Sequence, residues 1–316
     1  MVILFTAKLS EKHKEKLVAL YSEVEFIFAN DIQEAEKHLD KAEVVVTYGA
    51  DLDEEKLSRA TNLKWIMVLS AGVDQLPLKQ IEERGIVVTN SSGIHKVQMA
   101  EYTISMLLQV YRQEQTFFES QKNHHWNNSV KIKEISEQTM LVLGTGAIGE
   151  EIARLGKAFR MKTIGISRSG NKVDYFDEVH KLDKLMEVLP QADFVVSVLP
   201  GTKETQYLLN KEHFKQMRNS AVFVNIGRGN LVKSEDILYA IQQEEIAHVI
   251  LDVFEQEPLP EDHPFWNEPN ITMTPHISGN SPKYMTRALA IFEENLNKYM
   301  NGDTNYINTI DPSRGY

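Results

Sequence analysis

The chain has 316 residues, with 34 lysine and arginine residues against 45 aspartate and glutamate residues, and it has no cysteine. The length indicates two domains, and 42% hydrophobic residues suffice for a sizeable core. A net charge of −11 argues against nucleic-acid binding, which needs a basic surface to neutralise phosphates. The absence of cysteine excludes disulfides, thiolate metal sites and cysteine nucleophiles.

The predicted elements alternate between short β-branched runs and amphipathic segments. The first series has strands at 2–6, 25–28, 44–47, 65–69 and 87–89, with helices at 11–21, 32–39, 53–58 and 78–84. One long helix is predicted over 95–121. The second series has strands at 140–143, 163–166, 194–198, 222–225, 249–252 and 271–274, and a last helix covers 282–300. The alternation predicts α/β architecture with two doubly wound parallel-sheet domains.

The sequence also bears on where the protein works. The N-terminus has an apolar run, 2–5, without a basic region before it or a small-residue cleavage site after it, so we expect no signal peptide. No segment approaches the roughly 18 uninterrupted apolar residues of a membrane span. We therefore expect a cytoplasmic protein without a membrane partner.

A glycine-rich fingerprint follows the first strand of the second series. It reads Gly144, Thr145, Gly146, Ala147, Ile148 and Gly149, a G-x-G-x-x-G pattern at a strand-to-helix junction. Gly144 would permit the tight turn, Gly146 would let the backbone approach a pyrophosphate, and Gly149 would allow close helix packing. The N-terminus of the next helix would face the anion. This pattern predicts dinucleotide binding.

The end of the next strand bears on which dinucleotide binds. An NAD site usually has a carboxylate there for the ribose 2′-hydroxyl. This strand instead ends in Ser167, Arg168 and Ser169. Arginine can hold a 2′-phosphate in a bidentate geometry, and the serines add hydroxyl donors. The segment favours NADP(H); the alternative, in which Arg168 is an ordinary surface arginine, leaves NAD(H) open.

Polar residues follow three further strands of the second series. Arg228 lies between two glycines, Asp252 is followed by Glu255 and Glu257, and His276 follows a proline. In open parallel sheets, ligands bind outside the carboxyl ends of the strands, where these residues would converge. Each residue alone also has a structural explanation.

Together these motifs resemble the D-isomer-specific 2-hydroxyacid dehydrogenase family, and within it the glyoxylate/hydroxypyruvate reductases. Other matching segments are Ser70-Ala-Gly-Val-Asp, Thr89-Asn-Ser-Ser-Gly, Met99-Ala-Glu-Tyr, Leu199-Pro-Gly-Thr and Thr274-Pro-His. The resemblance implies a Rossmann-type cofactor domain, residues 99–283, inserted in a flavodoxin-like substrate domain, residues 1–98 and 284–316. It also implies a cleft between the domains that closes on the substrate.

The resemblance further implies an enzyme that reduces a small 2-keto acid, such as glyoxylate or hydroxypyruvate, with hydride from NADPH. Arg228 matches the family's substrate arginine and His276 its general acid, a role suited to a side chain that titrates near neutral pH. Glu257 matches the acidic partner of the histidine, because the family spacing from Arg228 selects it over Glu255. We expect Glu255 to be solvated.

Other site residues are likewise implied by the resemblance. Backbone N–H groups of Ala71 and Gly72 would bind the substrate carboxylate. Tyr48 would shape the pocket, although a half-buried strand tyrosine is an equal alternative. The nicotinamide end of the cofactor would be lined by Leu199, Pro200, Thr202, Asn225, Ile226, Gly227, Asp252 and His276.

Two further expectations concern partners. We expect no metal site, since His124 and His125 have no acidic cluster beside them. Trp126 is expected at an interdomain or subunit surface, and the family implies a homodimer. The alternative function is that of a nucleotide-sensing interaction protein of the C-terminal-binding corepressor type, whose additional partner-binding segments have no obvious counterpart here.

Overall fold

The computed structural model describes residues 1–73 and 75–313. Position 74, the last of the Ser70 motif, and positions 314–316, the end of the predicted substrate-domain segment, lie outside the described residues. The chain divides into two compact units, residues 1–94 with the chain from Ser281 onward, and His95–Asn280. Both boundaries fall a few residues before the predicted ones at 98/99 and 283/284.

The first unit contains a five-stranded, all-parallel sheet in the order β2-β1-β3-β4-β5. Its strands are β1 (Val2–Phe5), β2 (Glu25–Phe28), β3 (Val44–Thr47), β4 (Trp65–Val68) and β5 (Val87–Asn90). This order is that of flavodoxin-like sheets. The predicted flavodoxin-like arrangement is therefore confirmed.

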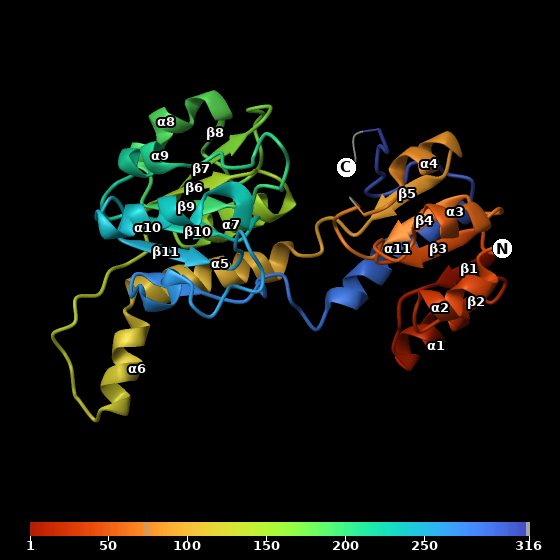
Figure 1. Cartoon of the computed structure of the whole chain (residues 1–316), viewed down its shortest axis with the longest axis horizontal. Coiled ribbons are helices and arrows are strands. Elements are labelled where there is room, and N and C mark those ends of the chain that lie inside the picture. Colours follow the sequence, from red (N-terminus) through yellow and green to blue (C-terminus); the bar gives the residue numbers. More distant parts are fainter. Residues whose placement is uncertain (74, 314–316) are drawn as a thin grey trace. The chain divides into compact units, whose positions relative to one another are not determined.

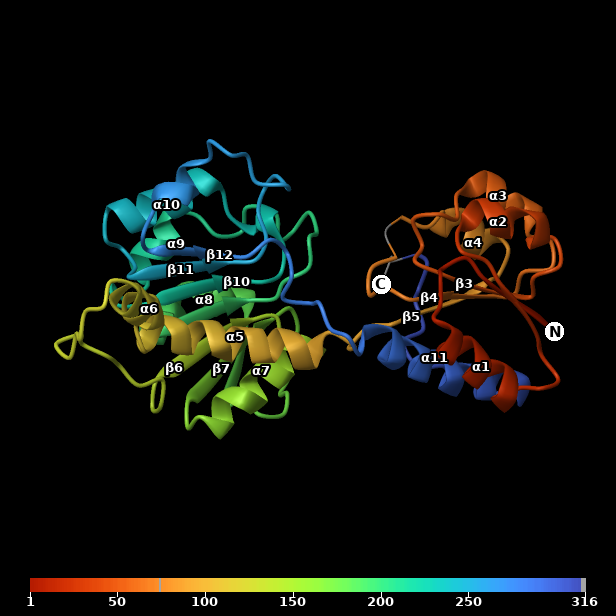
Figure 2. The same ribbon diagram turned by 90° about the horizontal axis from the view of Figure 1, so that it is seen from below.

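Helices cover both faces of this sheet (Figure 2). One face packs against α2 (Ile32–Ala35), α3 (Glu54–Arg59) and α4 (Leu78–Glu83). The other packs against α1 (Glu11–Leu20) and α11 (Tyr284–Met300). The strands β1, β3, β4 and β5 are almost entirely buried, as in other parallel sheets, whereas the edge strand β2 is partly exposed.

The second unit contains a seven-stranded parallel sheet in the order β12-β11-β10-β9-β6-β7-β8. Its strands are β6 (Thr139–Leu143), β7 (Lys162–Ser167), β8 (Glu178–Lys181), β9 (Phe194–Ser197), β10 (Val222–Asn225), β11 (His248–Leu251) and β12 (Ile271–Met273). Counted from β6, this is the Rossmann order extended by one strand. The order reverses between β6 and β9, which is where such sheets bind nucleotides.

Helices also cover both faces of the second sheet, as Figure 2 shows. On one face lie α5 (Lys96–Tyr111) and α7 (Ala147–Ala158). On the other lie α8 (Leu185–Val188), α9 (Lys211–Gln216) and α10 (Ser234–Gln242). The two doubly wound sheets confirm the predicted fold class.

The predicted single helix over 95–121 is wrong. The structure has α5 and then α6 (Glu114–Lys122), separated at Gln113, whose φ of 56° is left-handed. A left-handed residue interrupts the right-handed helical path. The apolar pattern continues past the break because of Phe117 and Phe118, but these side chains are exposed.

The segment after the break, residues 114–134, is called the α6 arm here. Figure 1 shows α6 and the following loop extending away from the rest of the second unit. Phe118, Trp126 and Ile132 are 62%, 92% and 45% exposed. In the described ranges, no helix is both long and apolar enough to cross a membrane.

Candidate active site

The glycine fingerprint forms the turn from β6 into α7. Gly144 has a φ of 103°, and a Cβ at Gly149 would lie 1.9 Å from the carbonyl oxygen of Gly144. Only glycine fits these two positions. A Cβ at Gly146 would meet nothing within 4 Å, so the space beside its backbone is open. Residues 145–148 are exposed or partly exposed at the start of α7, where backbone N–H groups lack helical partners. This geometry fits a bound pyrophosphate.

Arg168 lies just beyond β7, in an exposed turn. Oγ of Ser167 accepts from the N–H of Gly170, and Oγ of Ser169 accepts from the N–H of Asn171. Both serine hydroxyls therefore keep their proton for donation to another group. The turn offers cationic and hydroxyl groups and no carboxylate.

The loop after β9 comes close to this turn. The pKa of Glu204 is lowered, first by hydrogen bonds from Thr202 and its own backbone and in smaller part by the charges of Lys203 and Arg168. Leu199 is partly buried, whereas Pro200 and Thr202 are exposed. Because β9 adjoins β6 in the sheet, this loop and the fingerprint flank the same switch point.

Arg228 follows β10, and its loop is fixed by close backbone packing. A Cβ at Gly229 would lie 1.9 Å from the carbonyl group of Phe254, and one at Gly227 would lie 2.6 Å from the carbonyl oxygen of Leu199. Nδ2 of Asn225 donates to the carbonyl oxygen of Arg228 over 2.9 Å. Asn225, with Ile226 and Gly227, is buried, whereas the Arg228 side chain is exposed. The loop therefore presents a single guanidinium from a rigid backbone.

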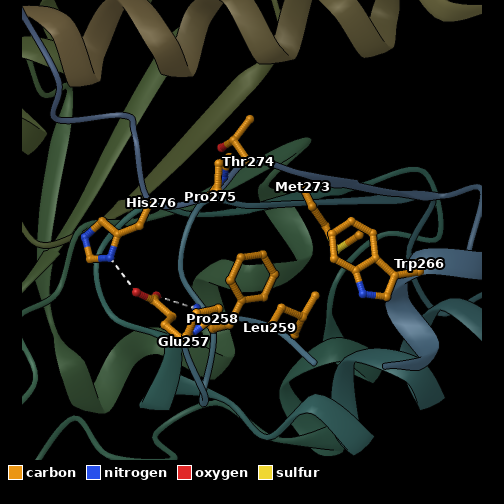
Figure 3. A pocket seen from close by; sticks show the side chains of 9 residues that line it. Glu257, Pro258, Leu259, Trp266, Met273, Thr274, Pro275 and His276 are labelled. Atoms are coloured by element: carbon orange, nitrogen blue, oxygen red, sulfur yellow. Dashed lines mark hydrogen bonds and ion pairs between the residues drawn. The ribbon is translucent and has the colours of Figure 1, made fainter. Parts of the chain in front are cut away.

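His276 and Glu257 form a hydrogen-bonded pair (Figure 3). Nδ1 of His276 lies 2.7 Å from Oε2 of Glu257, and Oε1 of Glu257 accepts from the N–H of Phe254 over 3.0 Å. Both carboxylate oxygens are thus engaged, and the imidazole is oriented by the carboxylate.

Glu255 has a different role. It is exposed, and its Oε2 accepts from the N–H of Ser234 at the start of α10. A carboxylate at a helix N-terminus is favourable because it satisfies a free N–H group and complements the helix dipole. The structure therefore brings Glu257, and not Glu255, to the histidine.

Asp252 lies deeper than the sequence reasoning implied. Its side chain is completely buried and accepts from the Thr274 hydroxyl and from the N–H groups of Ile277 and Ser278. Asp252 therefore anchors the segment that carries His276. Contact of Asp252 with the nicotinamide stays a prediction.

A cavity of about 600 Å³ adjoins the His276–Glu257 pair. Figure 3 shows its lining, which is mainly apolar and consists of Phe254, Glu257, Pro258, Leu259, Trp266, Met273, Thr274, Pro275 and His276. Sequence reasoning did not assign Phe254, Leu259, Trp266 and Met273 to the site. Their only signal was their position close to Glu257 and His276 in the sequence, in the segment after β11 and at the end of β12.

The predicted substrate residues of the first unit follow neighbouring strands of its sheet. Tyr48 follows β3 and is 45% exposed, and Ala71 and Gly72 form an exposed turn after β4. The carbonyl oxygen of Ala71 accepts from Asn90, and that of Gly72 accepts from Ser70. The N–H groups of Ala71 and Gly72 have no acceptor among the described residues. These N–H groups could donate to an anion.

The Rossmann order, the open fingerprint at its switch point, and Arg228, Glu257 and His276 at the carboxyl ends of successive strands define a nicotinamide-dependent dehydrogenase. Residues 104–278 match the model for "D-isomer specific 2-hydroxyacid dehydrogenase, NAD binding domain". The chain belongs to this family of enzymes, as the sequence motifs predicted.

Relatives of known name and structure agree with this assignment. A D-isomer specific 2-hydroxyacid dehydrogenase family protein from Aeromonas salmonicida is 35% identical, with a TM-score of 0.86 and coverage of 98% of this chain and 99% of that one. The NADPH-dependent glyoxylate/hydroxypyruvate reductase of Sinorhizobium meliloti, solved with NADP and sulfate, is 27% identical, with a TM-score of 0.82 and coverage of 100% and 99%. The mouse glyoxylate reductase/hydroxypyruvate reductase is 33% identical over 75% of this chain and 73% of its own.

Proposed function

We propose that the protein reduces a small 2-keto acid, with glyoxylate and hydroxypyruvate as the first candidates, to the D-2-hydroxy acid, using NADPH. The observation that carries this proposal is the 2.7 Å hydrogen bond between His276 and Glu257 at the same sheet edge as the nucleotide fingerprint. Relatives named glyoxylate reductase and hydroxypyruvate reductase support the choice of substrate.

Reduction of a keto group needs a hydride on carbon, a proton on oxygen and an anchor for the substrate. The nicotinamide, when bound, supplies the hydride. Nδ1 of His276 is held by Glu257, so the opposite nitrogen, Nε2, donates the proton to the carbonyl oxygen. The Arg228 guanidinium binds the substrate carboxylate through two parallel N–H donors. The imidazole returns to its charged form by taking a proton from solvent.

The preference for NADPH rests on the turn after β7. It has no carboxylate to repel a 2′-phosphate, and Arg168 with the hydroxyls of Ser167 and Ser169 can bind one. The relative from Sinorhizobium meliloti is solved with NADP. NAD(H) remains the competing cofactor.

Several roles are proposed from the family resemblance. Ala71, Gly72 and Tyr48 are proposed to contact the substrate, and Leu199, Pro200, Thr202, Asn225, Ile226, Gly227 and Asp252 to line the nicotinamide end of the cofactor. A cytoplasmic location and a homodimeric assembly are proposed as well, the latter from the exposed side chains of the α6 arm.

Steady-state kinetics test this function. The purified protein is assayed with NADPH and NADH against glyoxylate, hydroxypyruvate, pyruvate and 4-methyl-2-oxopentanoate. We expect turnover with kcat/KM at least about tenfold higher for NADPH, since a charged hydrogen-bonded contact is worth about 1.5–3 kcal/mol. Arg168→Ala should remove most of that preference and leave kcat/KM with NADH nearly unchanged.

The outcomes separate the candidate functions. A clear preference for NADH would reject the assignment of Arg168 while leaving the reductase intact. Tight NADPH binding without turnover of any keto acid would instead favour the nucleotide-sensing alternative.

A further inference from the structure

A hydrogen-bond chain leads from α5 to the segment that carries His276, and it runs from the partly buried Tyr102 and Thr274 to the completely buried Asp252. The hydroxyl oxygen of Tyr102 lies 2.6 Å from Oγ1 of Thr274, and this Oγ1 lies 2.5 Å from Oδ1 of Asp252. An ionised carboxylate only accepts, so the Thr274 hydroxyl donates to Asp252. A hydroxyl has one proton, and Tyr102 therefore donates to Thr274. The chain has a single direction, from Tyr102 through Thr274 to Asp252.

Asp252 fixes the backbone of the histidine and of the two residues that follow it. Its carboxylate accepts from the N–H groups of Ile277 and Ser278, both over 2.9 Å. Its backbone carbonyl oxygen accepts from the N–H of His276, also over 2.9 Å. One buried residue thus holds three consecutive residues, 276–278.

His276 needs such support because its φ is 53°. The left-handed region is unfavourable for a residue with a Cβ, and it persists only where neighbouring groups enforce it. Here the enforcing group is the Asp252 carboxylate, whose hydrogen-bond partners are arranged in turn by Thr274 and Tyr102.

We propose that Tyr102 is a positioning residue for reduction: through Thr274 and Asp252, it keeps the imidazole of His276 aligned with the substrate oxygen. This inference rests on the proposed function of His276. Tyr102 does not line the cavity of about 600 Å³ beside the pair, so its effect is transmitted through the chain of hydrogen bonds.

The Tyr102 hydroxyl is a donor at every working pH. Burial, as the largest cause, and the nearby charge of Asp252 raise the pKa of Tyr102 to about 12, against an opposing effect of the hydrogen bond with Thr274. Its protonated state therefore does not change during turnover.

The test compares Tyr102→Phe with Tyr111→Phe. Tyr111 lies on the same helix, is buried, and its hydroxyl makes no hydrogen bond to any described residue. Loss of one partly buried hydrogen bond predicts a decrease in kcat of about three- to tenfold for Tyr102→Phe, with the Kd for NADPH nearly unchanged and the Tm lowered by no more than about 4 °C. Tyr111→Phe should keep the wild-type kcat. Equal effects of the two substitutions, or less than a twofold loss in Tyr102→Phe, would overturn the proposal.

Two further variants separate positioning from general structural support. In a His276→Ala background, Tyr102→Phe should lower the residual kcat no further, because the group it positions is gone. A further decrease would show that Tyr102 acts otherwise. Thr274→Val removes the hydroxyl and should lose at least as much kcat as Tyr102→Phe, whereas Thr274→Ser keeps a hydroxyl and should lose less kcat than Thr274→Val. Equal kcat values for the two Thr274 variants would show that the hydrogen bonds through Thr274 do not position His276.

A readout that needs no turnover keeps this inference distinct from the proposed function. The imidazole signals of His276 are assigned in ¹H–¹³C NMR spectra by comparison with His276→Ala. Tyr102→Phe should shift or broaden these signals, and Tyr111→Phe should not. If the wild-type protein reduces no keto acid, the proposed function fails, and the NMR comparison still decides whether Tyr102 positions the ring.

Discussion

The hydrogen bond that Nδ1 of His276 donates to Glu257 decides which ring nitrogen is available for chemistry. It leaves Nε2 as the ring nitrogen that can donate to the proposed substrate. Glu257 is itself held by the N–H of Phe254, so neither member of the pair depends on solvent for its orientation. Preorganised groups of this kind need no rearrangement as the proton moves.

Substitution of His276 by alanine should lower kcat about 10²- to 10⁴-fold, because the general acid is removed. Glu257→Gln should lower kcat about 10- to 100-fold, since an amide stabilises the imidazolium less than a carboxylate does. Single-turnover measurements with NADPH and a keto acid check both. Glu255→Gln is the matched control, since Glu255 bonds to the start of α10, and it should keep kcat. An unchanged kcat in His276→Ala would reject the assignment.

At the scale of single residues, the sequence allowed roles to be assigned to side chains, but it did not show how deeply those side chains are buried. The motif spacing distinguished Glu257 from Glu255, and the structure pairs Glu257 with the histidine. Nothing in the sequence showed that Asp252 is buried beneath the backbone of His276 or that Tyr102 reaches it through Thr274. Those contacts depend on how α5 packs on the sheet, which periodicity does not specify.

At the scale of elements, the accuracy of prediction followed the strength of the pattern. The buried parallel strands are continuous apolar runs, so their existence was predicted. Their observed ends differ from the predicted ends by a residue or two. β8 was missed because Glu178–Lys181 contains one aliphatic residue and none of its residues is buried. The break between α5 and α6 was missed because the apolar pattern of the sequence continues across it. This pattern gave no indication of the left-handed conformation of Gln113.

The edge pair β11 and β12 makes the second unit sensitive to acid. His248 is mostly buried, and this burial lowers its pKa to about 4, while its Nε2 lies 2.9 Å from Oγ1 of Thr272. The folded state thus disfavours protonation of His248, whereas the histidine of the unfolded chain has an ordinary pKa of about 6.5. This stabilisation is complete above pH 6.5 and is lost as the pH falls toward 4. It should amount to about 2 kcal/mol between pH 7 and pH 5.

Urea unfolding of the wild-type chain and of His248→Gln at pH 7 and pH 5 measures this effect. Glutamine can still hydrogen-bond with Thr272 but does not titrate. The free energy of unfolding should therefore fall about 2 kcal/mol more in the wild type than in the variant. Identical pH dependence in the two proteins would show that His248 does not contribute.

At the scale of the whole molecule, the sequence predicted two α/β units and the insertion of one into the other. The alternation of strands and helices supported the prediction of two units. Only the family resemblance supported the prediction that one unit is inserted in the other. The strand orders could not be read from the sequence, because they depend on which strands pair across long crossovers. The switch point between β6 and β9, which locates the nucleotide, is a property of that order.

Assembly should involve the α6 arm. Phe118, Trp126 and Ile132 are exposed there, and burial of such side chains against a second copy is favourable by about 1.5–3 kcal/mol each. Analytical ultracentrifugation should show a dimer, and Trp126→Asp combined with Phe118→Ser should shift it toward the monomer. Leu20→Ser, at an exposed leucine of α1, is the control and should leave the mass unchanged. A monomeric wild type would contradict the homodimer.

The position of α11 has a consequence for biosynthesis. Residues 95–280 leave the ribosome as one contiguous block, so the second unit can fold while the first is still incomplete. Until α11 emerges, α1 alone covers one face of the first sheet, and Trp65 lacks its stacking partner Phe292, whose ring centroid lies 5.6 Å from that of Trp65 in the folded chain. The nascent N-terminal segment therefore exposes apolar surface until α11 has been synthesised. We expect binding of a chaperone to this segment to matter most during that interval.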